Sequence, residues 1–531
     1  MTTFSLCVAL SAIAFALVVR SRGTRSRLPL PPGPKKLPLV GNLFDLPPAF
    51  EWKSFAEWSR KYDSDIIHLN LAGQSLIVLS SSRAAEDLLE KRSTVYSDRP
   101  FFTMITDLMA WDFNLLLMKY GEGLEFQCHA HAFLMLPPPI SGPRWRTHRR
   151  LFNQAFSITT AKKFEPIELK STCGLLRRLL HTPEGFRQHI KQMAGETILS
   201  ITYGIDVLPK DDPYMALAEE TVKVGVMAIA PGKFLVDSIP MLKHIPDWFP
   251  GAGFKIKAKE WRELGRRSRE VPFAETKRQI ASGTAPYSFT ANSLQTLAES
   301  TNPYYTEDTV QETAVMMYLA GSDTISAALT SFVLAMLANP EAQRKAQLEL
   351  DSVTGGKRLP DFNDKPDLPY VSALVKEVLR WGPVAPIGIP HFLEVEDEYR
   401  GFRIPANSIV IGNAWAILQD ETTYPDPTTF KPERFLLDGK LNPNVKDSEV
   451  TTFGFGRRMC PGRHMAKSSV WISVACILAT FDITKALTDD GQPIEPTYEY
   501  LSEVISAPAP FKCAIRPRSP DLAALVESTV N

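Results

Sequence analysis

One segment near the carboxyl end carries the residues best suited to hold a metal. It reads Phe453-Gly-Phe-Gly-Arg-Arg-Met-Cys-Pro-Gly462 and contains a single cysteine, Cys460. Two glycines within four residues favour a tight turn in which the backbone approaches a flat ligand closely. Pro461 is favoured at the first position of a helix, so the sequence predicts Cys460 at the helix cap. There we expect the helix dipole to lower the pKa of the thiol and to stabilise a thiolate, the form that ligates metals.

A second segment places small polar groups inside an apolar helix. Residues 306–338 begin with a capping threonine, end before Asn339-Pro340 and are apolar on nearly every face, which is typical of a helix through the middle of a domain. At the centre lies Ala320-Gly-Ser-Asp-Thr324. We expect the glycine to open the helical ladder and leave room for a small ligand. The alternative is that Asp323 makes only structural hydrogen bonds and Thr324 bonds to its own helix.

Several candidate residues also have common structural roles. Glu377 and Arg380 lie three apart on a predicted helix over 370–381, hence on one face. An isolated pair at this spacing is usually solvated and contributes about 0.3–0.5 kcal/mol. A lone cysteine such as Cys460 is more often a buried structural thiol. A lone histidine such as His391 is more often a satisfied core or surface residue.

Taken together, the motifs resemble those of the cytochrome P450 family, of the microsomal and fungal-like type. The cysteine segment fits Phe-x-x-Gly-x-Arg-x-Cys-x-Gly at every fixed position, a match that chance gives in well under about one in ten thousand chains of this length. The resemblance implies haem b as cofactor, with Cys460 as the axial ligand of its iron. It also implies that Arg458 pairs with a haem propionate, that Phe453 shields the sulfur, and that Gly454 and Gly462 leave room for the macrocycle.

The resemblance assigns roles to the other motifs as well. Asp323 and Thr324 would relay protons during oxygen activation. Glu377 and Arg380 would be buried and would meet Arg434, from a Pro-Glu-Arg-Phe segment, in a structural triad that locks the irregular stretch before the cysteine segment.

Further residues are expected to contact the cofactor itself. Trp145 and Arg149 match the Trp-x-x-x-Arg helix that holds one haem propionate in the family. His391 resembles a position that often serves the same propionate, and Ala320 would lie against the macrocycle.

The elements that must position these residues are mostly helical. Helical patterns dominate from 145 to 381, and the alternation over 66–80 predicts a small β-hairpin. Short strands are expected over 391–412 with a turn near 405–407, then an irregular proline-rich stretch to about 450 and a final helix from 461 to about 480. The fold class is therefore mainly α with small β-sheets, and the resemblance implies one haem domain over 49–520 with a tail over 521–531.

The amino terminus is predicted to be a membrane anchor. Residues 2–19 carry no charge and would span ~27 Å as a helix, close to the thickness of the endoplasmic reticulum bilayer. Four arginines between 20 and 27 should stay cytosolic. A cleavable signal peptide is the competing interpretation, but it would place basic residues before the apolar run. We therefore expect an anchor over 1–20, followed over 21–48 by a basic, proline-rich and extended spacer.

Residues 122–142 depart from the family pattern. Their deletion would join Tyr120-Gly121 directly to Pro143-Arg144-Trp145, a natural junction for the family. Their codons could also hold splice signals. We therefore hypothesise a retained short intron, which would weaken haem binding because it abuts the propionate-binding helix. The alternative is a genuine loop insertion near the substrate pocket.

Composition narrows the set of partners. Lys plus Arg and Asp plus Glu are 59 each, so no basic surplus indicates nucleic-acid binding. The six cysteines include no CxxC pair, which argues against a zinc site or a disulfide framework. No glycine-rich dinucleotide motif is present, so electrons would come from NADPH through a separate haemoprotein reductase, with cytochrome b5 as a second candidate donor. A basic docking face could include Arg146, His148, Arg149 and Arg150, although solvated charge is the simpler interpretation for His148 and Arg150.

The expected activity is insertion of one oxygen atom from O2 into an apolar small molecule, in secondary metabolism or xenobiotic oxidation. The pocket is expected to draw on 101–119, roughly 215–250, Ala320, Thr324, Val384–Ile389 and Val504–Ser506, and the last two segments are uncharged. Two other functions remain open. One is a haem-thiolate isomerase or dehydratase that needs no reductase, and the other is an inactive haem-binding form disabled by residues 122–142.

Overall fold

The computed structural model describes residues 28–120, 142–230 and 232–529. The predicted anchor over 1–20 lies outside these ranges, as does the atypical segment except for Gly142.

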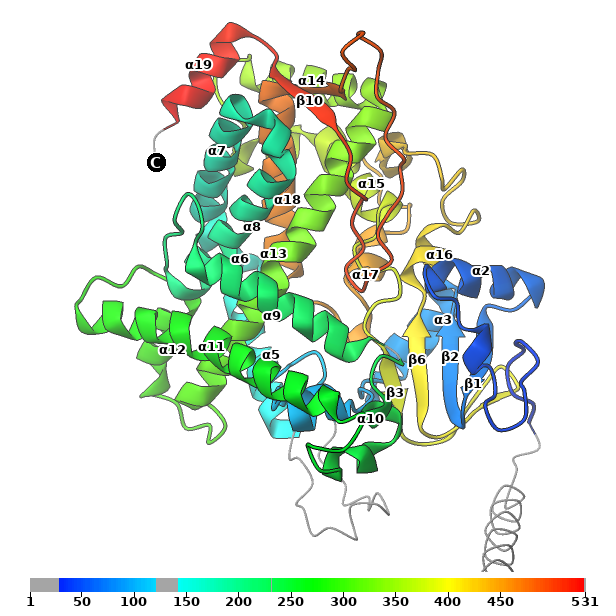
Figure 1. Ribbon diagram of the computed structural model, residues 1–531. Helices are drawn as coiled ribbons and strands as arrows, with labels where there is room; N and C mark the ends of the chain where they lie inside the picture. The colour runs from blue at the N-terminus through cyan, green and yellow to red at the C-terminus, as the bar shows by residue number, and fades with distance from the viewer. Residues whose placement is uncertain (1–27, 121–141, 231, 530–531) are drawn as a thin grey trace, which may run out of the picture.

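The long central helix organises the helical body. Helix α13 spans Glu307–Ala338 and is capped by Thr306, whose hydroxyl accepts a hydrogen bond from the Thr309 N–H, so its predicted bounds are confirmed. It packs against α8 (Phe186–Tyr203), α18 (Arg463–Thr480), α5 (Gly142–Ala155) and α15 (Pro369–Trp381). Figure 1 shows α13 running through the middle of these helices. Among the described residues it alone is long and apolar enough to span a membrane, but it is mostly buried in the protein and is therefore a core helix.

The expected opening of this helix at Gly321 is not found. Helix α13 is regular from end to end. A Cβ on Gly321 would collide with the side chain of Ile198 on α8. Gly321 therefore serves the close approach of two buried helices, which the sequence of one helix alone could not indicate.

The remaining helices surround this core. The longer ones are α2 (Glu51–Lys61), α7 (Glu165–His181), α9 (Pro213–Ile229), α11 (Gly253–Ala281), α12 (Phe289–Leu297), α14 (Pro340–Thr354) and α19 (Pro520–Ser528). The short ones are α3 (Ser82–Ala85), α4 (Ser93–Tyr96), α6 (Ile158–Ala161), α10 (Leu235–Ser238), α16 (Ala414–Leu418) and α17 (Ser448–Thr452). Single turns used below are η2 (Glu86–Lys91), η3 (Met104–Leu108), η6 (Pro240–His244) and η8 (Pro432–Phe435).

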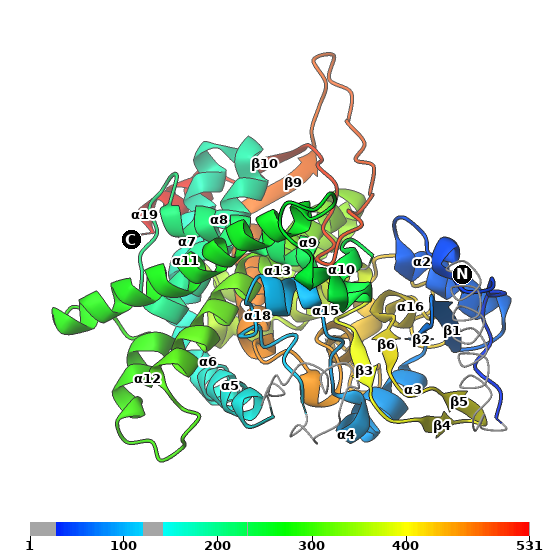
Figure 2. The same cartoon turned by 60° about the horizontal axis from the view of Figure 1, so that its bottom comes forward.

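Four strands form the largest sheet, in the order β1-β2-β6-β3. Strands β1 (Ile66–Leu71) and β2 (Gln74–Leu79) form the predicted antiparallel hairpin, and β2 pairs in parallel with β6 (Ser408–Gly412). Strand β3 (His391–Leu393) pairs with the other edge of β6. Figure 2 shows these strands side by side. Two-stranded sheets join β4 (Asp397–Tyr399) to β5 (Phe402–Ile404), β7 (Leu436–Leu437) to β8 (Lys440–Leu441) and β9 (Phe481–Lys485) to β10 (Cys513–Pro517).

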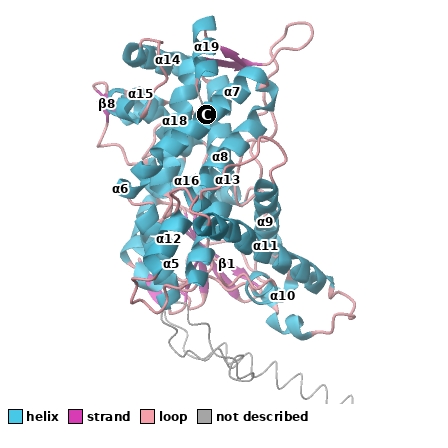
Figure 3. Ribbon diagram, turned by 90° about the vertical axis from the view of Figure 1, so that its left-hand side faces the viewer, coloured by secondary structure: helices cyan, strands magenta, loops and turns pink. Residues whose placement is uncertain are grey.

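The strands are few and short beside the helices, as Figure 3 shows. The turn predicted near 405–407 is present, with Asn407 at φ 59°. A mainly α fold with small β-sheets is therefore confirmed for the described part of the chain.

Both ends of the described chain pack against the body of the protein. The proline-rich segment expected to be a spacer is packed on the sheets, because Pro32 and Pro29 accept backbone hydrogen bonds from His68 on β1 and Arg403 on β5. The predicted tail over 521–531 is mostly helical, since α19 buries Leu522 and Val526. The contacts that order the amino-terminal segment come from residues distant in sequence.

A buried carboxylic acid joins α7 to α18. Glu168 is fully buried, and the Ser468 hydroxyl donates to its Oε1 at 2.8 Å. Burial raises the pKa of Glu168 from 4.5 to about 8. Because the pKa of Glu168 is raised in the folded state, its protonated form contributes to the free energy of unfolding. This contribution is fully present below pH 4.5 and is lost as the pH rises through about 8.

Replacing Glu168 with glutamine will therefore remove part of the pH dependence of stability. Between about pH 5 and pH 8, the wild type will lose up to ~1.4 kcal/mol of unfolding free energy per pH unit relative to the variant. Urea unfolding across this range measures the difference. Parallel profiles for the two proteins would show that Glu168 does not titrate as described.

Candidate functional site

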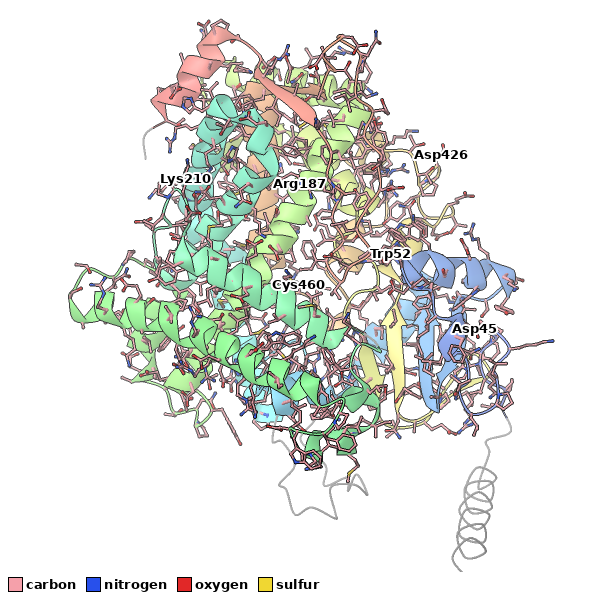
Figure 4. The ribbon with its side chains drawn as sticks, in the orientation of Figure 1. Asp45, Trp52, Arg187, Lys210, Asp426 and Cys460 are labelled. Carbon is pink, nitrogen blue, oxygen red and sulfur yellow. The ribbon has the colours of Figure 1, made fainter. Side chains whose placement is uncertain are left out.

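The segment that carries Cys460 runs from α17 to α18 and is fixed at both ends. The Cys460 N–H donates to the Phe453 carbonyl at 2.7 Å. Gly454 and Gly456 both have positive φ values, 84° and 54°. A Cβ on Gly456 would also collide with the backbone of η2, so this position requires glycine. Figure 4 shows the labelled Cys460 in the middle of the molecule.

Two details of the cysteine prediction are wrong. Helix α18 begins at Arg463 rather than at Pro461, so Cys460 lies before a turn and not at the helix cap. The pKa of the thiol is raised rather than lowered, because its burial outweighs the hydrogen bond from Gly462 and the charges of Arg149 and Arg463. A thiol in such a place becomes a thiolate when a metal cation displaces its proton.

Space for a flat ligand borders both this segment and α13. A Cβ on Gly454 or Gly462 would meet no atom within 4 Å. At the centre of α13, Ala320 is exposed and Thr324, one turn later, is half-exposed, although most of the helix around them is buried. An exposed side in the middle of a core helix indicates an internal space, which fits a macrocycle such as haem.

A cluster of buried and half-buried basic side chains lies beside the cysteine segment. Burial and the nearby guanidinium groups hold the pKa values of Arg99 and His391 well below their usual ranges, and they lower the pKa of Arg458 to about 9. Burial also lowers the pKa of Arg149. Among the residues that the structure describes, the one acidic side chain that acts on Arg99 and Arg458 is Asp98. The three arginines gathered in this way favour the binding of an anion between them.

The cluster is held in place by backbone carbonyls. Arg458 donates to Ser97 and Met118 at 2.7 and 2.6 Å, Arg149 donates to Met459 at 2.9 Å, and Arg99 donates to Ile389 and Pro390 at 2.7 Å. His391 Nδ1 lies 2.7 Å from the Tyr96 carbonyl. Sequence reasoning missed Arg99, since it belongs to no recognised motif.

Trp145 completes this part of the site. Its indole N–H is buried and has no hydrogen-bond acceptor in the described part of the chain. The Arg458 guanidinium lies 4.8 Å from the centre of the indole ring. An orphaned donor next to clustered cations fits the two propionates of a haem, so the residues present fit the group that the sequence motifs imply.

The predicted triad meets in the core. Arg380 donates twice to Glu377, at 2.7 and 2.8 Å, and both side chains are 0% exposed. Arg434 donates to Glu377 at 3.1 Å. Arg380 also binds the carbonyls of Leu418 and Pro427. The triad therefore joins α15 to the irregular stretch that leads to the cysteine segment.

The structure separates the two residues of the expected proton relay. The Thr324 hydroxyl donates to the Ala320 carbonyl at 2.9 Å. Thr324 therefore bonds to its own helix, which is the structural alternative to the proton relay. Asp323 instead faces a small cavity of about 20 Å³ between α8, α9 and α13, which is room for about one water molecule. Lys191 lies 3.8 Å from Asp323 and 2.8 Å from Glu219. In the described part of the chain, no hydrogen bond joins Asp323 to Thr324.

The prediction of a basic docking face is wrong for one of its residues. His148 is buried between α5 and α13, with Nδ1 2.7 Å from the Thr313 hydroxyl and Nε2 3.2 Å from Glu312. It is therefore neither a docking residue nor solvated. Arg146 and Arg150, one turn apart on α5, are exposed.

Hydrogen bonds join the segments expected to line the substrate pocket into two pairs. The Ser506 N–H donates to the Val384 carbonyl at 2.8 Å. The Met104 N–H donates to Asp237 at 2.8 Å, which joins segment 101–119 to segment 215–250.

Comparison with known proteins identifies the same family as the sequence motifs. The family model described as Cytochrome P450 matches residues 139–513. The chain is 43% identical over 530 residues to cytochrome P450 monooxygenase 98 of Postia placenta, covering 99% of this chain and 98% of that protein. It is 42% identical to cytochrome P450 monooxygenase ple1 of Rhodocybe pseudopiperita, with 92% and 90% covered. It is 39% identical to tryptamine 4-monooxygenase of Psilocybe cyanescens, with 94% and 95% covered.

Proposed function

The chain belongs to the cytochrome P450 family and is a monooxygenase of that family, and on this premise we propose that it oxidises an apolar small molecule with Cys460 as haem ligand. Family membership implies a haem-thiolate cofactor and a reductase partner, here an NADPH–haemoprotein reductase. The observation that carries the proposal is the half-buried Cys460, whose segment borders both an internal space and a cluster of three arginines, Arg99, Arg149 and Arg458.

The chain's own residues bind and orient the cofactor. When bound, the haem supplies the activation of dioxygen, which thiolate ligation favours. Arg99, Arg149, Arg458 and the indole N–H of Trp145 would hold the propionates. Gly462 donates a backbone hydrogen bond to the sulfur, which stabilises its negative charge.

Asp323 is positioned to hold and pass a proton. Burial raises the pKa of its carboxyl, so protonation costs less there than in water. The ammonium group of Lys191 lies between it and Glu219. Through this cavity Asp323 can exchange protons with solvent, while Thr324 presents a hydroxyl on the side of Ala320.

Replacing Asp323 with asparagine will slow product formation by about 10²-fold, because the proton carrier is lost. Electrons from NADPH will then end as hydrogen peroxide rather than product. Product and peroxide per NADPH consumed measure this split. Glu220→Gln, an exposed position on the neighbouring helix α9, is the control and should behave as wild type. Equal product yields for the wild type and the Asp323 variant would exclude this role.

The substrate is proposed to be an apolar metabolite of secondary metabolism. The facing segments Val384–Ile389 and Val504–Ser506 carry no charge. One relative is named for its action on tryptamine, an aromatic amine with a large apolar ring. We further propose that residues 1–20 anchor the protein in the endoplasmic reticulum membrane with the catalytic domain in the cytosol.

Isotope labelling tests the proposed function. The full chain is combined with NADPH–haemoprotein reductase, ¹⁸O₂ and a set of apolar probes, namely an indole, a sesquiterpene and a medium-chain fatty acid. The expected product carries one ¹⁸O atom and forms only with NADPH. Equal turnover without NADPH and reductase would instead support an isomerase.

A further inference from the structure

Helix α5 carries two pairs of polar or charged side chains, and the two members of each pair lie four residues apart. Trp145 and Arg149 face the cysteine segment, where Arg149 donates to the Met459 carbonyl at 2.9 Å. Arg144 and His148 precede them by one position and are therefore turned by about 100° around the helix axis. This second pair faces α13, against which α5 packs. Because both pairs share one rigid helix, the contacts of the second pair fix where the first pair points.

One carboxylate of α13 receives the second pair. Arg144 donates to both oxygens of Glu312, at 2.6 and 3.3 Å, and His148 Nε2 lies 3.2 Å from the same carboxylate. The side chain of Glu312 is 8% exposed and that of His148 is 0% exposed. A third cation, Arg269 on α11, lies 4.0 Å from Glu312. Burial alone would raise the pKa of Glu312, but the hydrogen bonds from His148 and Arg144 outweigh it and lower the pKa, so the carboxylate stays ionised.

The His148 ring is fixed at its other nitrogen as well. The Thr313 hydroxyl donates to the Thr309 carbonyl at 2.7 Å, so its oxygen is left to accept from His148 Nδ1, which is 2.7 Å away. Nδ1 therefore carries a hydrogen, and Nε2 is directed at Glu312. Since His148 and Thr313 are fully buried, α5 cannot rotate or slide without breaking buried polar contacts, which is costly.

We propose that Glu312 is a positioning residue for the cofactor, because it sets the rotation of α5 about its axis and so directs Trp145 and Arg149 at the propionates. The inference rests on the proposed function for the identity of the bound group. Glu312 acts through Arg144 and His148, the chain neighbours of the residues that would hold the propionates. Binding groups must be held to within about 0.5 Å, and a side chain as long as that of Arg149 amplifies any rotation of its helix.

The test measures the rate at which the haem-loaded full chain releases haem to an excess of apomyoglobin. Glu312→Gln keeps the size of the side chain but removes its charge, and Arg144 retains an anionic partner in Asp112, 2.9 Å away, so we expect this variant to fold. Haem release should be about tenfold faster than in the wild type, the effect of losing roughly one charge-assisted hydrogen bond at the propionates. An unchanged rate would contradict the proposal.

A second variant acts on the same contact without changing any charge. Thr313→Val keeps the shape of the side chain but removes the acceptor of His148 Nδ1. Haem release should be about threefold faster, the effect of one neutral hydrogen bond. This variant keeps the proposal testable even if Glu312→Gln folds poorly, and a wild-type rate in Thr313→Val would count against it.

Glu196 provides the matched control. It lies on α8 and accepts from Arg178 on α7 through both oxygens, at 2.9 and 3.1 Å, with a side chain that is 19% exposed. This pair resembles that of Arg144 and Glu312 but joins α7 to α8 rather than α5 to α13. Glu196→Gln should change the rate of haem release by less than about twofold. If it accelerated release as much as Glu312→Gln, general loosening of the protein would explain both results and the proposal would be wrong.

A double-mutant cycle separates positioning from general stability. If Glu312 acts through α5, Arg149 is already misdirected in Glu312→Gln. Adding Arg149→Met to that variant should then accelerate haem release less than Arg149→Met does in the wild type. Accelerations that simply multiply would show that Glu312 acts independently of Arg149, which would overturn the proposal.

Amide hydrogen exchange over residues 144–152 tests the helix contact apart from the cofactor. We expect faster exchange in the Glu312→Gln full chain than in the wild type or Glu196→Gln. A wild-type chain that takes up no haem would refute the proposed function, whereas faster exchange in Glu312→Gln would still support Glu312 as the residue that fixes α5. Equal exchange in all three proteins would refute the positioning role itself.

Discussion

Replacing Glu377 with alanine will lower the free energy of unfolding by about 3–5 kcal/mol and prevent stable haem loading. The variant leaves Arg380 fully buried and Arg434 nearly so, without the carboxylate that both contact. A buried charge that loses its partner carries its full desolvation cost. The irregular stretch bound by these arginines would then loosen, and with it the support of the cysteine segment. Urea unfolding and haem content of the purified full chain measure both effects.

The chain offers a matched control for this prediction. Glu341 and Arg344 on α14 have the same three-residue spacing and lie 2.9 Å apart, but both are exposed. Glu341→Ala should change the free energy of unfolding by less than about 0.5 kcal/mol, because solvent screens the pair. If both substitutions had the same small effect, burial would not be what makes the Glu377 triad important.

Replacing Cys460 with serine will abolish NADPH-dependent oxidation while the helical fold is kept. Serine has nearly the same size, but its hydroxyl does not supply the thiolate that the family's chemistry uses. Product formation with the probe set used above measures the loss, and circular dichroism monitors the fold. Cys173→Ser, at a half-buried free thiol on α7, is the control and should retain activity. Retained oxidation in the Cys460 variant would assign the ligand to another residue.

Local signals in the sequence predicted the elements well. The Thr306 cap and Asn339-Pro340 gave the correct ends of α13, since helix ends depend on neighbouring residues. The alternation over 66–80 likewise gave the hairpin of β1 and β2. In the site, the motif residues Glu377, Arg380 and Arg434 meet as the resemblance implied.

Properties that depend on packing could not be predicted in this way. Arg99, Lys191 and Asp237 enter their sites from distant elements and carry no local pattern. The pKa of Cys460 was given the wrong direction because its burial cannot be inferred from the segment alone. His148 was expected in solvent for a similar reason, since its partner Thr313 lies 165 positions later in the chain.

The reduced, carbon monoxide-bound absorption spectrum of the full chain tests the central claim most directly. A thiolate opposite carbon monoxide shifts the Soret band strongly to the red, whereas a neutral ligand does not. We expect the shifted band in the wild type and in Cys173→Ser, and its loss in Cys460→Ser. An unshifted band in the wild type, or a shifted band in the Cys460 variant, would contradict the assignment of Cys460 as the iron ligand.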